Sequence, residues 1–246
     1  MNEPANSRNR LLVGVEEALD RSSRIGKAMV TFSRGGATHE RIGVIERVET
    51  VPGGGIRLAG ADHASVVVPA AVASIGIDRS SKMKDKVYPR LDFCDAAGKP
   101  IFSIVGFEGL EPFDAALAGC REEARGPVEP RPQAKDEQIA AELPAFDALR
   151  LAQLSGQVVT ISHGTDGFSQ EWRGKIAALK PAMGFTNIID PDFHLHLKDG
   201  VLSDWRLESD ASTDGALTYV ACDRDGNPIG LRIRGPALAF AAVRIH

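Results

Sequence analysis

The stretches CDAAGKPI (94–101) and CDRDGNPI (222–229) decide the fold, because they read as two copies of one turn. They are identical at five of eight positions and lie 128 residues apart. MVTFSRGG (29–36) aligns with VVTISHGT (158–165) at an offset of 129. Ordered matches at a nearly constant offset indicate an internal repeat, the alternative being chance recurrence of a common turn sequence. We therefore predict a tandem duplication.

The matches divide the chain into two repeats and a connection. We expect the first repeat over 10–117 and the second over 137–246. The stretch 118–136 between them is rich in proline and charge and has no apolar periodicity, as is typical of a linker.

Within each repeat the patterns predict one helix followed by strands. Leu12, Val15 and Leu19 share one helical face, and Phe146, Leu149 and Gln153 trace a second helix that ends at Gly156. Short alternating segments separated by turn residues predict antiparallel strands. In the first repeat these are 27–33, 41–50, 55–59, 65–69, 73–78, 89–95 and 100–107, and in the second 193–198, 201–207, 217–223 and 229–235.

One hairpin has a specific turn signal. Asp199-Gly200 favours a type I′ turn, which would pair 193–198 with 201–207. Taken together, the patterns predict an α+β fold of two tandem repeats. Each repeat would be an N-terminal helix followed by a large antiparallel β-sheet, and the two sheets would stack with pseudo-two-fold symmetry.

Charge and apolar content narrow the class of protein. With 29 basic and 33 acidic residues, the sequence has no excess of positive charge that would favour a nucleic-acid partner. Glu16 and Glu17 interrupt the apolar residues near the N-terminus, and no apolar run approaches the roughly 20 residues of a membrane span. We expect a cytoplasmic protein without membrane insertion.

The second half contains a set of residues in a recognisable order: Met183, Gly184, Asn187, Asp190, Pro191, Phe193, Leu195, His196, Leu197, Trp205, Asp214, Gly215, Asp223, Gly226 and Ile229. With these residues it resembles the C-terminal repeat of the HemS/ChuS/PhuS-type haem-utilisation (haemin transport and degradation) proteins, which are related to the ChuX/HutX type. In the first half, THERIGVIERV (38–48) and LDFCDAAGKPI (91–101) resemble further motifs of this family.

The resemblance implies the fold of that family and haem as the ligand. Two departures concern the haem contacts. The helical segment that carries the family's axial histidine has no counterpart in this shorter chain, and Glu208 and Ser209 stand where the family has a basic pair. The shorter ChuX/HutX-type relatives also lack that segment and are haem binders or traffickers, so the resemblance still implies haem binding for this chain.

His194, His196 and Lys198 share one face of the strand predicted at 193–198. Two imidazoles and an ammonium group could bind a haem iron or its propionates, or the three residues could form a solvated polar face. A metal site is a third reading, although no third ligand stands at a useful spacing.

Arg232 and Arg234 alternate in the same way and could hold propionates, or they could pair with acidic residues across the sheet. His163, at a strand end, could contact the ligand or cap backbone groups.

His39 is expected at the surface. Cys94 and Cys222, at equivalent repeat positions, are expected to be packed in the core.

We expect a cytoplasmic protein that binds haem or a related tetrapyrrole and serves its trafficking in haem and iron utilisation, with a protein partner in haem transfer. Two alternatives stay open: a haem-degrading enzyme of the same family, and a diverged interaction or regulatory module without haem. The sequence has no nucleotide fingerprint or catalytic triad that would favour another chemistry. Haem iron is the only metal expected.

Overall fold

A computed structural model describes residues 8–83, 85–124, 146–208 and 215–241. The chain forms two compact units, and neither is a continuous stretch of sequence. The first contains the described residues of Met1–Phe32, Glu40–Gln133 and Asp166–Ser169; the second contains those of Ser33–His39, Ala134–Thr165 and Gln170–His246. Each unit therefore includes a short segment from the other half of the sequence.

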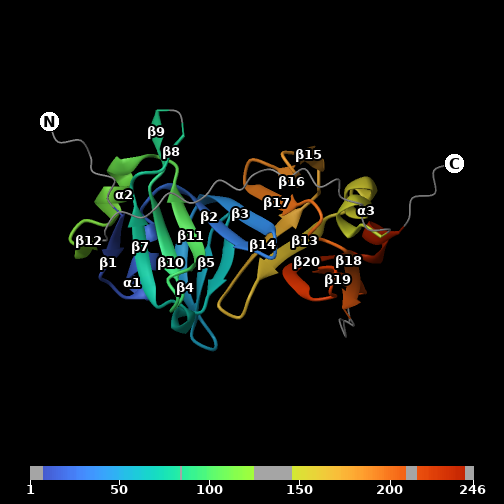
Figure 1. Cartoon of the computed structure of the whole chain (residues 1–246), viewed down its shortest axis with the longest axis horizontal. Coiled ribbons are helices and arrows are strands. Elements are labelled where there is room, and N and C mark those ends of the chain that lie inside the picture. The colour runs from blue at the N-terminus through green and yellow to red at the C-terminus, as the bar shows by residue number, and fades with distance from the viewer. Residues whose placement is uncertain (1–7, 84, 125–145, 209–214, 242–246) are drawn as a thin grey trace. The chain divides into compact units, whose positions relative to one another are not determined.

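The first half of the sequence supplies two α-helices, a 3₁₀ helix and antiparallel strands (Figure 1). The elements are β1 (Arg8–Leu11), α1 (Val15–Ser22), β2 (Lys27–Arg34), β3 (Ala37–Val44), β4 (Arg47–Val51), β5 (Gly55–Ala59), β6 (Ala64–Val67), η1 (Pro69–Ala71), β7 (Ser74–Asp78), β8 (Lys82–Met83), β9 (Lys86–Val87), β10 (Arg90–Cys94), β11 (Pro100–Gly106), α2 (Leu110–Ala116) and β12 (Glu122–Ala124). In the first unit, neighbouring strands follow the order β12-β1-β7-β10-β11-β2, and β4, β5 and β6 form a meander. The β8–β9 hairpin projects from this unit (Figure 1).

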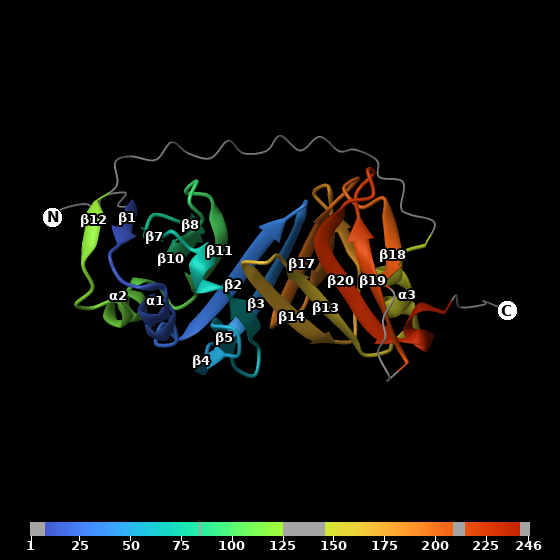
Figure 2. The same cartoon turned by 90° about the horizontal axis from the view of Figure 1, so that it is seen from below.

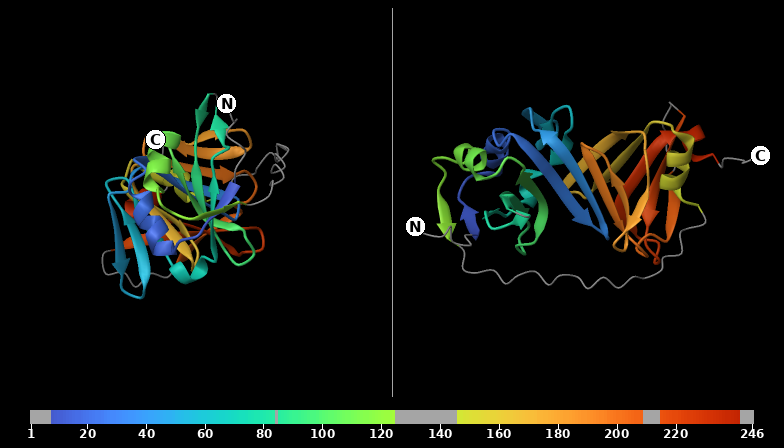
Figure 3. Two further views of the ribbon diagram at one scale, coloured as in Figure 1. Left: turned by 90° about the vertical axis from the view of Figure 1, so that its left-hand side faces the viewer. Right: turned by 90° about the horizontal axis from the view of Figure 1, so that it is seen from above.

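The second half supplies α3 (Ala148–Ser155), β13 (Val159–Gly164), β14 (Phe168–Gly174), β15 (Lys180–Ala182), β16 (Phe185–Ile189), β17 (Phe193–Lys198), β18 (Asp204–Glu208), β19 (Ala216–Cys222), β20 (Pro228–Pro236) and η2 (Ala237–Phe240). In the second unit, β15, β16 and β17 form one antiparallel layer, and β18-β19-β20-β13 form another (Figure 2). Helix α3 lies against η2 (Figure 3, right).

Local chemistry explains where α3 begins and ends. The carboxylate of Asp147 accepts hydrogen bonds from the backbone N–H groups of Leu149 and Arg150, which satisfies two donors that have no partner inside the helix. Gly156 ends the helix with φ +61°, a left-handed conformation that a residue without Cβ adopts at little cost.

Two hairpins, β10–β11 and β19–β20, share one turn structure. In each, an aspartate side chain accepts hydrogen bonds from two backbone N–H groups: Asp95 from Ala97 and Lys99, and Asp223 from Asp225 and Asn227. Both hairpins also have a register irregularity just before the turn, next to Cys94 and next to Cys222. Both cysteines are buried, as predicted. The two CD-x-x-G-x-P-I stretches thus form the same local structure.

A core of aromatic rings organises the first unit. Phe93, Phe102 and Phe168 form a column in which neighbouring ring centroids lie 4.4 Å apart. Phe168 belongs to the short segment 166–169 from the second half of the sequence, and the N–H of Val68 donates to the carbonyl oxygen of Gly167 in the same segment. The first unit therefore obtains one of its core rings from the second half.

The second unit receives residues 33–39 in return. The N–H of Lys198 donates to the carbonyl oxygen of Gly36 (2.9 Å). A Cβ atom at Gly36, whose φ is +77°, would lie 2.6 Å from Cγ1 of Val201, so this contact requires glycine. The core of this unit packs the inward residues of β17 against those of β13 and β20 and includes Ala37.

Four element predictions need correction. The first helix begins at Val15, so Leu12 lies outside it, and β1 (Arg8–Leu11) precedes this helix, which is therefore not the first element of its repeat. Residues 41–50 form parts of two strands, because β3 ends at Val44 and β4 begins at Arg47. Strand β17 does not pair with 201–207: it pairs with β16, and β18 pairs with β19. In the stretch predicted as a linker, 122–124 form β12, which pairs with β1, while 125–136 lie outside the described residues.

The other strands predicted for the first half are present, and the fold is α+β with antiparallel sheets, as predicted. None of the helices in the described part of the chain is long and apolar enough to cross a bilayer.

Candidate functional site

Strand β17 alternates as its sequence predicts. Phe193, Leu195 and Leu197 are buried, while His194 and His196 are half-buried and Lys198 is exposed. The buried side chains belong to the core that also contains residues of β13 and β20. The two histidines and the lysine therefore lie on the outer face of the β15–β17 layer.

The strand register places further residues on this outer face. Across the antiparallel pairs, Lys180 stands opposite Asn187, which stands opposite His196. A second row joins Ala182, Phe185 and Lys198 in the same way. Directly opposed residues project to the same side of a sheet, so this face combines two ammonium groups, two imidazoles and an aromatic ring.

A groove of about 570 Å³ lies along this face. Its lining residues are Thr38, Lys180, Ala182, Met183, Phe185, Asn187, Ile189 and His196. Most of the lining surface is apolar, and the polar groups are few. This composition is typical of small-molecule sites, in which a few polar groups orient a largely apolar ligand.

Asn187 holds the ring of His196. The Oδ1 atom of Asn187 lies 2.7 Å from Nδ1 of His196. The Nδ2 atom of the same amide donates to the carbonyl oxygens of Lys180 (3.0 Å), Phe185 (3.1 Å) and Ala182 (3.4 Å). His194 lies beside His196, with ring centroids 5.9 Å apart. A buried amide thus orients one imidazole of the groove.

The turn between β15 and β16 carries an unusual backbone conformation. Met183 has φ +54° and Gly184 has φ +73°, so both central residues of this two-residue turn have positive φ, as a type I′ turn requires. Of the described residues, Met183 is the only one other than glycine with positive φ, and its side chain is 80% exposed at the groove. The strained turn presents an apolar, flexible side chain to the groove.

Acidic groups lie next to the groove, just before β17. Burial and the neighbouring Asp192 raise the pKa of Asp190, whereas His194 and Lys180 act in the opposite direction. The positive charges of the face therefore already influence this carboxyl group.

His163 lies inside the second unit instead of on the groove face. Its side chain is fully buried on β13, and burial lowers its pKa to about 4. His39 is also fully buried, which corrects the expectation of a surface position. Its ring stacks on that of His163 (centroids 6.5 Å apart) and meets Phe193 edge-on.

Arg232 and Arg234 lie on β20 in the other layer. The neighbouring Leu231 and Ile233 face the core, so the two arginines face outward from that layer. Arg232 pairs with Glu208 (3.6 Å), the acidic residue at the family's basic position; Ser209 lies outside the described residues. The structure thus brings His194, His196 and Lys198 together and leaves Arg232, Arg234 and His163 elsewhere.

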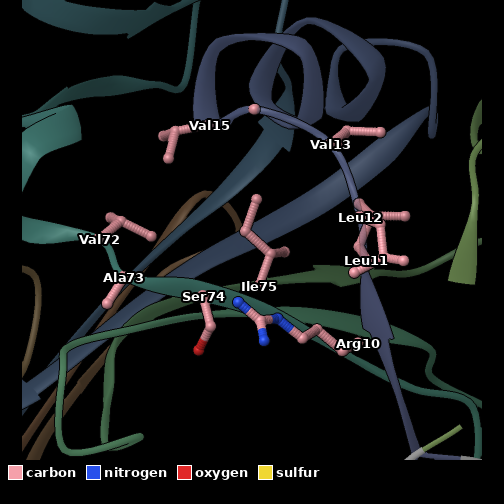
Figure 4. Close-up of a pocket in the computed structure, with 10 residues that line it drawn as sticks. Arg10, Leu11, Leu12, Val13, Val15, Val72, Ala73, Ser74 and Ile75 are labelled. Carbon is pink, nitrogen blue, oxygen red and sulfur yellow. The ribbon is translucent and has the colours of Figure 1, made fainter. Parts of the chain in front are cut away.

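A second hollow, of about 390 Å³, lies in the first unit between the start of α1 and β7. Figure 4 shows Val13, Val15, Val72 and Ile75 around it, with Arg10 and Ser74 at its lower side. Its lining contains no imidazole or thiolate, so the groove on β15–β17 is the better candidate for binding a metal-containing ligand.

The fold and the groove define an α+β protein of two antiparallel units with a histidine-bearing groove on one of them. Neither a family model nor a curated protein matches the sequence. Among solved structures, the chain is similar to the haem-degrading enzyme ChuS of Escherichia coli O157:H7, with a TM-score of 0.75 at 15% identity over 94% of this chain and 82% of ChuS.

It is also similar to holo-PhuS, a haem-binding protein of Pseudomonas aeruginosa, with a TM-score of 0.75 at 18% identity over 96% of this chain and 88% of PhuS. The predicted HemS/ChuS/PhuS-type fold is therefore confirmed.

Sequence reasoning missed Lys180, Phe185 and the pairing of Asn187 with His196. A signal for them exists: 180 and 182 alternate, and so do 185, 187 and 189, so each set lies on one face of a strand. The sequence does not show which strands become neighbours, and that determines the groove.

Proposed function

We propose that this chain binds haem or a related tetrapyrrole in the groove on β15–β17 and serves haem trafficking in the cytoplasm. The observation that supports this most directly is the His196 imidazole, held by Asn187 within a largely apolar groove flanked by Lys180 and Lys198. The likeness in fold to holo-PhuS and ChuS points to the same ligand.

The donor set fits haem, which is a flat apolar macrocycle with an iron centre and two carboxylates. Phe185, Ile189 and Met183 would pack against the macrocycle, and the two lysines would attract the propionates. His196 would provide the nitrogen ligand, and bound haem would supply the iron that accepts it. The groove volume, about 570 Å³, lies within the range of small-molecule sites.

We also propose that the two halves are tandem repeats, 10–117 and 137–246, whose sheets stack with pseudo-two-fold symmetry. The identical turns at Asp95 and Asp223 support this, as does the exchange of 33–39 for 166–169, since these segments partly overlap when the halves are aligned at an offset of 129. Each half also contains an early helix that packs in a core, α1 or α3, although in the first half β1 precedes this helix.

Haem degradation is the second candidate function, because ChuS, whose fold this chain has, is a haem-degrading enzyme. Degradation would need a reductant, whereas trafficking would need a protein partner that receives the haem. A third candidate function is that of an interaction module without haem. It is favoured by Glu208, which stands where the family has a basic residue and which pairs with Arg232. The titration below tests this candidate as well.

Titration of the purified protein with haemin, followed by the Soret band, tests the proposal. We expect a saturable shift with one haem per chain, and a dissociation constant raised on the order of tenfold or more in His196→Ala, because the iron loses its ligand. Arg232→Ala/Arg234→Ala is the matched control and should bind as wild type does.

Wild-type protein that shows no saturable shift would eliminate both haem functions and leave the interaction module. A shift that survives His196→Ala and His194→Ala unchanged would place haem outside the groove. Turnover of the bound haem when a reductant is added would favour degradation over trafficking.

A further inference from the structure

The amide of Asn187 has one possible orientation. Three backbone carbonyl oxygens, those of Lys180, Ala182 and Phe185, surround its Nδ2 atom at 3.0–3.4 Å. A flipped amide would place Oδ1 against these oxygens, and acceptors would then face acceptors. The hydrogen-bond network therefore assigns Nδ2 to the carbonyls and Oδ1 to His196.

This orientation decides which nitrogen of His196 carries the proton. An amide oxygen only accepts hydrogen bonds, so Nδ1 of His196, 2.7 Å away, must be the donor. In a neutral imidazole the other nitrogen then has the lone pair. In its neutral form, His196 is thus held with its proton on Nδ1 and its lone pair on Nε2.

We infer that Asn187 is a positioning residue that fixes His196 as the Nδ1–H tautomer, so that the groove selects a metal-loaded tetrapyrrole over the metal-free macrocycle. This inference rests on the proposed function for its ligand. An imidazole whose remote N–H is held by a hydrogen bond is both oriented and more basic as a metal ligand.

The selection of haem over metal-free protoporphyrin follows from the one part of the ligand in which the two differ. Haem and metal-free protoporphyrin present the same ring and the same two propionates, so Phe185, Ile189, Lys180 and Lys198 treat them alike. They differ at the centre, where only the metal accepts the Nε2 lone pair. His196, oriented by Asn187, is therefore the group that distinguishes them.

The tautomer is measured first, in the protein without ligand. Long-range proton–nitrogen NMR correlations of ¹⁵N-labelled protein, assigned with His196→Ala, should show a protonated Nδ1 and an unprotonated Nε2. In Asn187→Ala this pattern should change to exchange between the two tautomers. A wild-type ring protonated on Nε2, alone or on both nitrogens, would overturn the inference whether or not haem binds.

The selectivity is measured next, as the ratio of dissociation constants for haemin and metal-free protoporphyrin IX. Asn187→Ala should weaken haemin binding by about 10- to 100-fold, the usual effect of losing such a supporting hydrogen bond, and change protoporphyrin binding little. Thr186→Ala, on the same strand but on the opposite face, is the matched control and should keep the wild-type ratio.

An equal loss of affinity for both ligands in Asn187→Ala, or no loss for either, would show that Asn187 only supports the fold or has no role in binding. The two proposals fail separately. An Nδ1–H tautomer in a protein that binds neither ligand refutes the proposed function alone, whereas haemin binding by a ring protonated on Nε2 refutes this inference alone.

Discussion

The imidazole of His163 shows how a single residue can couple stability to pH. Burial lowers its pKa to about 4 from 6.5. As pH falls below 6.5, the unfolded chain takes up a proton that the folded chain refuses until about pH 4. The free energy of unfolding therefore decreases across this window, by about 3 kcal/mol at most from this residue.

We predict that His163→Gln flattens this dependence between pH 7 and pH 4. Urea unfolding followed by fluorescence of the two tryptophans measures it, and the quantity compared is the slope with pH, since the substitution also changes stability at pH 7. Ser162→Ala, the outward-facing neighbour on β13, should keep the wild-type slope. An unchanged slope in His163→Gln would assign the acid sensitivity to other groups.

At the same scale, the sequence predicts which residues of one strand share a face but not what they touch. The alternation in FHLHLK correctly places His194, His196 and Lys198 together. The same alternation in ATHERIG puts His39 on a face with Ala37 and Arg41, all buried, yet no local signal distinguishes that face from an exposed one. The partner of His196 depends on strand register, which sequence patterns do not encode.

At the scale of elements, the turns at Asp95 and Asp223 allow a paired prediction. Removing either carboxylate leaves two backbone N–H groups without their acceptor, so Asp95→Ala and Asp223→Ala should each lower the melting temperature by about 2–4 °C. Asp95→Asn and Asp223→Asn keep an acceptor oxygen and are the matched controls. If calorimetry finds a lower melting temperature for only one of the two alanine variants, the two turns are not equivalent.

The turn between β15 and β16 predicts opposite effects on stability and binding. Asparagine tolerates the left-handed conformation better than methionine, so Met183→Asn should raise the free energy of unfolding by about 0.5–1 kcal/mol. The same change removes an apolar side chain from the groove and should weaken haemin binding. Chemical denaturation and haemin titration of one preparation measure both, and tighter binding would exclude Met183 from contact with the ligand.

Most strands were predictable because their turns contain glycine, proline and aspartate. The hairpin predicted at Asp199-Gly200 failed for a physical reason. The outward residues of β17 belong to the groove face of one layer, whereas Trp205 of β18 is buried in the core and β18 pairs with β19 in the other layer. A turn signal shows where a strand ends but not which strand is its neighbour.

At the scale of the whole molecule, Phe168 connects the second half of the sequence to the stability of the first unit. Its ring lies 4.4 Å from that of Phe102 and 5.2 Å from that of Phe32. Phe168→Ala should destabilise this unit by about 3–5 kcal/mol, because the cavity would form in its core.

Amide hydrogen exchange of Phe168→Ala measures this loss of stability, and we expect the amides of β10 and β11 to exchange faster than in the wild type. Ser169→Ala, the next residue, is the control. Loss of protection confined to the second unit would contradict the assignment of Phe168.

The repeat predicted two similar units, but its matches suggested that each would be a continuous stretch. The exchange of 33–39 for 166–169 was not predictable, because both segments read simply as the ends of strands. Which core a strand end enters depends on contacts between residues far apart in the sequence, and these leave no local pattern.

That exchange has an evolutionary consequence. If a gene duplication produced the two halves, they could not afterwards diverge independently, because each encodes a few residues of the other's interior. A substitution around Phe102 must remain compatible with an aromatic ring encoded in the other half, and one at Val201 with the glycine at 36. Recombination between the halves of distant relatives would then give a folded protein only when segments 33–39 and 166–169 fit the cores that receive them. This requirement would keep the two halves together as one inherited unit.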